Sequence, residues 1–124
     1  MIFSCVFVFA SCSLAPNSDP SKAAEALEEA DYTVYKIDNE IALKFYLPES
    51  INNCIAFISA NKGDDSISIF YFDTKSNAKE SWKAYQNNIK ELQEIAEKSG
   101  QKIIAKQSGK MFYCGTEQAI KDAQ

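Results

Sequence analysis

Apolar residues recur in this 124-residue chain at spacings that alternate between the periods of helices and strands. One stripe, with spacings of three and four residues, lies on one side of a long helix. Its members are Ala78, Trp82, Tyr85, Ile89, Leu92 and Ala96. Asn77 with Glu80 resembles a capping box, and Gly100 suits a C-terminal cap. We therefore predict a single long helix that begins near residues 73–77 and ends before Gly100.

Several segments are rich in the β-branched and aromatic residues that favour strands. They are residues 32–37, 54–60, 66–72, 102–106 and 110–114. Glycine and Asx residues at 61–65, and Ser108 with Gly109, supply what two hairpin turns need. The chain therefore predicts two hairpins and one isolated strand.

Three shorter helices are also expected. Asp19 and Pro20 cap and open a helix at about 20–30, and Thr116 caps a final helix at about 117–123. Residues 39–47 fit both helical spacing and strand alternation, and we favour a short helix that ends at Pro48.

From residue 32 the order is strand, short helix, two strands, long helix and strand. This order matches the split βαβ pattern of ferredoxin-like domains, with an added strand. We predict an α+β fold in which an antiparallel sheet of four to five strands packs on the long helix, with extra terminal helices.

The strands are apolar on both of their faces, which a sheet with one solvated face would not show. On the strand at 66–72, Phe70 and Phe72 lie on one face, and Ile67, Ile69 and Tyr71 lie on the other. The strands at 54–60 and 110–114 likewise carry apolar residues on both faces. Two explanations stay open. A terminal helix covers the second face, or that face is an interaction surface for a homodimer or a ligand. The residues of this candidate surface are Ile67, Ile69, Tyr71 and Tyr113.

The chain begins with an uncharged apolar run at 2–10, and no charged residue precedes Asp19. The run is shorter than the roughly 20 residues of a membrane span and ends in Phe9-Ala10-Ser11-Cys12. This ending resembles the lipobox of bacterial lipoproteins. The resemblance implies a signal peptide at 1–11 and a diacylglycerol-modified Cys12. Turn-forming residues then predict a tether at 12–19, and the chain length predicts one domain at 20–124.

That resemblance also implies attachment to the extracytoplasmic face of the cell membrane, through fatty acyl groups such as palmitate. The end of the chain, from Phe112 to Ile120, is similar to small lipoproteins of unknown function. This second similarity implies no activity.

The composition excludes several kinds of chemistry. All thirteen basic residues are lysines, so the chain has no imidazole for a catalytic relay or a metal and no guanidinium fork for phosphates. A net charge of −4 also argues against nucleic acid as a partner. We predict no metal and no cofactor.

Two cysteines remain if Cys5 leaves with the signal peptide and Cys12 carries lipid. Cys54 and Cys114 form either a disulfide or two buried free thiols, and the sequence leaves both open. The acidic pairs Asp64-Asp65 and Glu28-Glu29 are adjacent in sequence, so their side chains point apart. We therefore predict a non-catalytic domain that binds an envelope protein or a small ligand, with a carboxylate- or thiol-dependent enzyme as the alternative.

Overall fold

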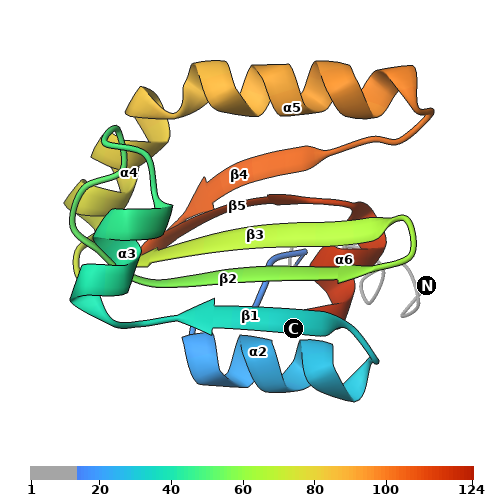
Figure 1. Cartoon of the computed structure of the whole chain (residues 1–124), viewed down its shortest axis with the longest axis horizontal. Helices are drawn as coiled ribbons and strands as arrows, with labels where there is room; N and C mark the ends of the chain where they lie inside the picture. The colour runs from blue at the N-terminus through green and yellow to red at the C-terminus, as the bar shows by residue number, and fades with distance from the viewer. Residues whose placement is uncertain (1–13) are drawn as a thin grey trace, which may run out of the picture.

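The computed structural model describes residues 14–124, which form an α+β domain with a five-stranded antiparallel sheet and five helices (Figure 1). Cys12 lies outside the described residues. The helices are α2 (Pro20–Glu29), α3 (Glu40–Tyr46), α4 (Lys75–Ala84), α5 (Gln86–Lys98) and α6 (Glu117–Asp122). The strands are β1 (Thr33–Ile37), β2 (Cys54–Lys62), β3 (Asp65–Phe72), β4 (Ile104–Ser108) and β5 (Met111–Gly115).

The sheet has the strand order β1-β2-β3-β5-β4, and every neighbouring pair is antiparallel. Gly63 and Gly109 form the turns of the β2–β3 and β4–β5 hairpins with φ values of +58° and +57°. Glycine reaches this left-handed region without a steric penalty, so both predicted hairpins are confirmed.

The ferredoxin-like arrangement is not confirmed, because a split βαβ unit has another strand between its two parallel strands, whereas β1 here pairs directly and antiparallel with β2. In a βαβ unit the chain would cross over a sheet face after β1. Instead, α3 lies at the end of the sheet where β1 ends and β2 begins, and β2 returns directly beside β1 (Figure 1).

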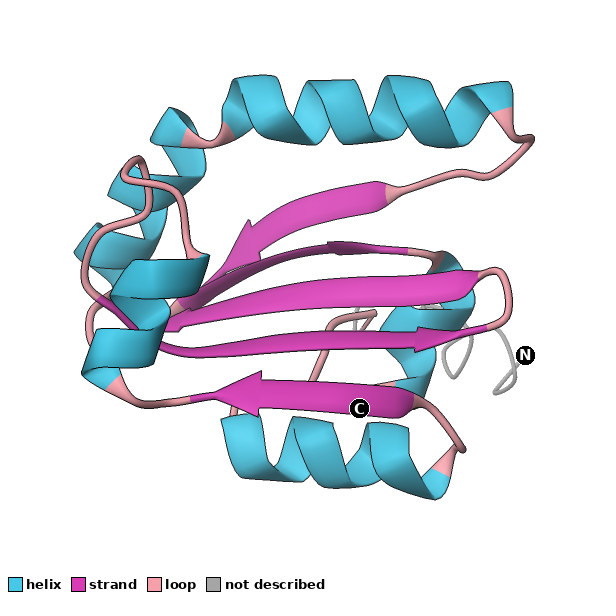
Figure 2. Cartoon of the chain, viewed as in Figure 1, coloured by secondary structure: helices cyan, strands magenta, loops and turns pink. Residues whose placement is uncertain are grey.

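Two helices cover the sheet face that carries Tyr113, here called the Tyr113 face. Side chains of α2 and α6 form one buried cluster with β2, β3 and β5. In the view of Figure 2, α6 lies behind the strands. The candidate interaction surface lies inside this cluster, because Ile67, Ile69, Tyr71 and Tyr113 are each at most 3% exposed. The terminal helices therefore cover the second face within one chain, and this face is not available to a partner.

Residues 14–19, the docked segment, lie on the same face and do not form a free tether. Leu14 and Ala15 pack against the Tyr113 cluster. The backbone N–H of Asn17 donates to the carbonyl oxygen of Ala123 at 2.8 Å, so both ends of the described chain are joined. The predicted tether at 12–19 is thus part of the domain from Leu14 onward.

The opposite face, here called the Phe112 face, packs against α4. Phe112 stacks on Phe70 with ring centroids 4.5 Å apart, and the Trp82 ring lies 5.6 Å from Phe112. Aromatic pairs at these separations are favourable beyond their buried area. This packing confirms that the predicted helical stripe faces the core near Trp82.

The single long helix is not confirmed, because α4 ends at Ala84 and α5 begins at Gln86. Tyr85 between them has φ −94° and ψ 2°, and its ring packs 5.5 Å from Phe70. The break lets α4 lie on the sheet while α5 runs alongside β4 (Figure 1). The start at Lys75 lies within the predicted range, but the cap differs, since the Thr74 hydroxyl caps α4 by accepting from the N–H of Asn77.

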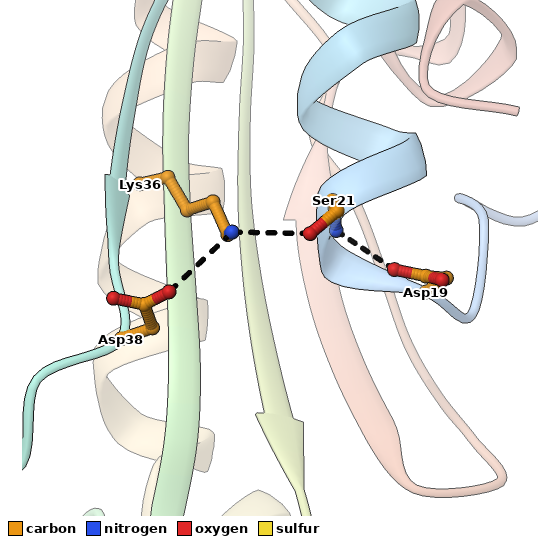
Figure 3. A network of polar contacts seen from close by, with 4 residues as sticks. All are labelled: Asp19, Ser21, Lys36 and Asp38. Carbon is orange, nitrogen blue, oxygen red and sulfur yellow. Dashed lines mark hydrogen bonds and ion pairs between the residues drawn. The ribbon is translucent and has the colours of Figure 1, made fainter.

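A small polar network fixes α2 against the edge strand β1 (Figure 3). Asp19 caps α2 by accepting from the N–H of Ser21 at 2.9 Å. The Lys36 ammonium donates to the Ser21 hydroxyl at 3.2 Å and lies 3.4 Å from the Asp38 carboxylate. The network is exposed, so we assign it a positioning role and little stability.

Candidate functional site

An open groove of about 890 Å³ lies between α3, the loop at 47–53 and the ends of β2 and β3. Its walls combine apolar and acidic side chains. The lining includes Asp38, Glu40, Leu43, Lys44, Leu47, Glu49, Ile51, Asn52, Asn53, Cys54, Ile55 and Asp73. We refer to it as the α3 groove.

One wall of the groove is α3, which depends on a cap and one buried anchor. The Asn39 side chain accepts from the N–H groups of Ile41 and Ala42 at 2.9 and 3.2 Å. Leu43 is the buried residue of the helix. A helix of seven residues is not stable alone, so the packing of Leu43 holds this wall in place.

The opposite wall is the loop before β2, which α4 holds. The buried hydroxyl of Ser81 accepts from the N–H of Asn52 at 3.3 Å and donates to its carbonyl oxygen at 3.2 Å. Asn53 follows with a φ of +62°, a left-handed conformation that asparagine tolerates better than most residues. Contacts far apart in sequence therefore set the shape of the groove.

Large apolar side chains are exposed on α3 and at Ile55 beside it. Ile41, Phe45 and Tyr46 of α3 are 74%, 86% and 73% exposed, and Ile55 at the start of β2 is 49% exposed. Ile55 lines the groove, whereas the three residues of α3 are not among its lining residues. Exposed hydrophobic side chains that lie close together are typical of interaction sites. Four of the seven large hydrophobic residues exposed in the described chain lie on α3 or beside it.

The charged groups of the groove are mostly carboxylates. Lys44 lies 3.7 Å from Glu40, and Lys36 lies near Asp38 as described above. Glu49 and Asp73 have no ion pair among residues 14–124. No group of three or more metal-ligating side chains converges within that range. The arrangement gives the groove a negative rim around apolar walls.

Cys54 is the one thiol in the groove. Its Sγ donates to the carbonyl oxygen of Ala56 at 3.2 Å, where the β2 register shifts. Burial is the largest cause that raises the pKa of this thiol to about 11. The thiol stays protonated at neutral pH, and a protonated thiol is a poor nucleophile.

The structure has Cys54 and Cys114 as free thiols rather than a disulfide. Cys54 lies opposite Phe72 of β3, whereas Cys114 lies opposite Ser68. Four residues of a strand span roughly 13 Å, well beyond the ~7 Å Cα separation that a disulfide allows. Burial also raises the pKa of Cys114 to about 11. The two thiols therefore do not form a redox pair.

The acidic pairs weighed for catalysis do not enter the groove. Asp64 and Asp65 line a second, smaller cavity of about 330 Å³ beside α6, where the Thr116 hydroxyl donates to Asp65 at 2.8 Å. Glu28 and Glu29 lie on the exposed side of α2. The two acidic pairs thus lie on different elements, and neither pair lines the groove that contains Cys54.

Sequence reasoning missed the α3 groove, although one signal was present. Ile41 and Phe45 are four residues apart, which puts them on one side of a helix. Leu43 anchors α3 from another side, so the helix carries more apolar residues than its packing uses. An apolar excess on so short a helix could have indicated an exposed surface.

Comparisons with protein families, curated proteins and solved structures found no match to this chain. Among the described residues, no helix combines the length and the hydrophobicity that a membrane crossing requires.

Proposed function

We propose that this protein is a lipid-anchored, extracytoplasmic lipoprotein with a non-catalytic binding domain. The observation that carries this proposal is the sequence Phe9-Ala10-Ser11-Cys12 at the end of an uncharged apolar run. Cys12 receives the lipid, and the domain from Leu14 onward is held at the membrane. Two or more acyl chains explain stable attachment, because one chain binds a bilayer only marginally.

The α3 groove supports binding as the role of the domain. Its apolar walls include Leu43, Leu47 and Ile55, and its rim carries carboxylates that select against acidic partners. The partner class is an envelope protein or a small ligand with an apolar part and a neutral or cationic part.

A thiol-dependent enzyme is the alternative, and Cys54 is its strongest candidate because it lines the groove. Such an enzyme needs a thiolate, which is favoured by a neighbouring cation or a helix N-terminus. Burial works in the opposite direction here and raises the pKa of Cys54 to about 11. This observation favours binding over thiol catalysis.

We do not propose a homodimer through the Tyr113 face, because α2 and α6 bury the residues of that candidate interaction surface. The surfaces left for partners are the α3 groove and the edges of the sheet.

The anchor is tested by expressing the full chain in a bacterium and measuring both membrane fractionation and intact mass. We expect the parent protein in the membrane fraction, with a mass that matches an acylated chain beginning at Cys12. Cys12→Ala removes the acceptor thiol, so this variant should carry no acyl mass and should not be cleaved. Cys5→Ala is the matched control and should behave as the parent does. An unmodified parent chain, or identical masses gained by the parent and Cys12→Ala, would refute the anchor.

A further inference from the structure

The docked segment begins at a defined place on the Tyr113 face. The Tyr113 hydroxyl donates to the carbonyl oxygen of Leu14 at 3.1 Å, and the Tyr71 hydroxyl donates to that of Asn17 at 2.7 Å. Leu14 is half-buried against the core cluster to which Ile104 of β4 also belongs. The chain therefore runs toward Cys12 from a point close to the β4–β5 hairpin.

Covalent geometry limits how far Cys12 can lie from this point. A chain spans at most about 3.6 Å per residue, so the Cα atoms of Cys12 and Leu14 are no more than about 7 Å apart. Acyl chains on Cys12 would enter a bilayer within this distance of the domain. The surface around Leu14 must then lie at the membrane.

We propose that the β4–β5 edge of the Tyr113 face rests on an anionic bilayer surface, with Lys106 in contact with lipid headgroups. This inference rests on the lipid anchor proposed above and adds the orientation of the domain and the chemistry of the surface it meets.

The charge distribution distinguishes this edge from the neighbouring helix. The segment 98–116 carries four lysines and no carboxylate, although the whole chain has a net charge of −4. Of these lysines, Lys106 lies on β4, Lys110 lies in the turn that follows it, and Lys98 and Lys102 precede the strand. The exposed side of α2, on the same face, carries Glu25, Glu28 and Glu29. An anionic surface attracts the first region and repels the second, so it tilts the domain toward β4 and β5.

Lys106 is the lysine that is best placed for this contact. It lies directly opposite Tyr113 in the β4–β5 pairing, so its side chain shares the face on which Leu14 docks. It is exposed on an edge strand of the sheet and makes no ion pair among residues 14–124. Its aliphatic stem can lie along the protein while its ammonium reaches the headgroups.

Lysines elsewhere in the chain provide internal controls. Lys44 lies on α3 at the end of the sheet, and Lys79 lies on α4, which covers the Phe112 face. Both are exposed, as Lys106 is. The proposed orientation leaves them in solvent while Lys106 meets the bilayer.

The test is lysine footprinting with a water-soluble acetylating reagent on the acylated full chain. The protein is reconstituted into vesicles of phosphatidylcholine with phosphatidylglycerol, into vesicles of phosphatidylcholine alone, and into neutral detergent. Mass spectrometry gives the acyl mass on Cys12 and the labelling rate of each lysine. We expect Lys106 to label about fivefold more slowly on the anionic vesicles than in detergent, with weaker protection on the neutral vesicles. Lys44 and Lys79 should label equally under all three conditions.

The outcomes separate this inference from the proposal beneath it. An acylated chain in which Lys44 or Lys79 is protected as much as Lys106 would overturn the orientation and leave the anchor intact. Equal protection of Lys106 on both kinds of vesicle would overturn the contact with anionic headgroups. Absence of acyl mass on Cys12 would overturn the anchor, and the orientation with it.

Discussion

Two tyrosine hydroxyls hold the docked segment on the domain. Tyr71 and Tyr113 are almost fully buried, yet their hydroxyls reach backbone carbonyl groups of Asn17 and Leu14. These phenols lie on strands, and the carbonyl groups lie roughly 50 and 100 residues earlier in the chain. The aromatic residues that sequence reasoning assigned to an interaction surface instead bind the protein's own N-terminal segment.

Tyr71→Phe and Tyr113→Phe should therefore loosen this segment while the core stays filled. Each substitution removes one hydrogen bond and leaves one carbonyl group without its partner, which costs about 1 kcal/mol in the free energy of unfolding. Urea unfolding measures this loss, and hydrogen exchange at residues 14–19 should become faster. Tyr35→Phe is the matched control, because Tyr35 is 61% exposed and should change neither quantity. Unaltered exchange in both core variants would contradict the docking.

The thiols of Cys54 and Cys114 make stability depend on pH under alkaline conditions. Burial raises the pKa of Cys54 and Cys114 from 9.0 to about 11. The folded chain holds these protons more tightly than the unfolded chain, so their contribution to stability is complete below pH 9 and is lost as the pH rises through 11. Each thiol contributes about 3 kcal/mol at most.

We therefore expect the free energy of unfolding to fall between pH 9 and pH 11, measured by urea unfolding under reducing conditions. Cys114→Ala removes one of the two thiols, so its stability should fall less steeply over this range than that of the parent. The buried tyrosines, whose pKa values are also raised by burial, contribute equally to parent and variant. Parallel curves for parent and variant would show that the Cys114 thiol is not linked to folding.

At the scale of the element, α3 offers a direct test of which side is buried. Leu43 is 5% exposed and Phe45 is 86% exposed, although both are large apolar residues on one short helix. Leu43→Ala should cost about 2–5 kcal/mol in the free energy of unfolding, because it leaves a cavity beneath the helix. Phe45→Ala should change stability by less than about 0.5 kcal/mol. Similar losses for the two variants would mean that α3 is not oriented as described.

Local sequence patterns predicted most of the elements. The cap at Asp19 and the turns at Gly63 and Gly109 act within a few residues and lie where the structure has them. Thr116 also has the predicted N-cap position, although its side chain makes no capping hydrogen bond. The isolated β1 strand and the short α3 helix were also predicted correctly. These features depend on local conformational preferences, which the sequence carries directly.

The features that sequence reasoning missed depend on contacts between distant residues. No proline or glycine marks the break at Tyr85, which follows from the packing of its ring on Phe70 and Phe112. Strand order depends on whether the chain after β1 crosses a face or returns at the same end. The α3 groove needs the hydrogen bonds between Ser81 and Asn52, which are 29 residues apart.

At the scale of the whole molecule, both faces of the sheet are closed within one chain. The docked segment, α2 and α6 bury the Tyr113 face, while α4 buries the aromatic part of the Phe112 face. Most of the large apolar residues that remain exposed in the described chain lie on α3 or at Ile55 beside it, and Lys106 lies on the edge strand β4. The surfaces that remain for binding are therefore the end and the edge of the sheet rather than its faces.

Light scattering coupled to size-exclusion chromatography, applied to residues 13–124, tests this closure most directly. The account predicts the mass of one chain over a wide range of protein concentration, because neither face of the sheet needs a second copy to cover it. A stable mass of two chains would contradict the account, since it would mean that a second copy completes the domain.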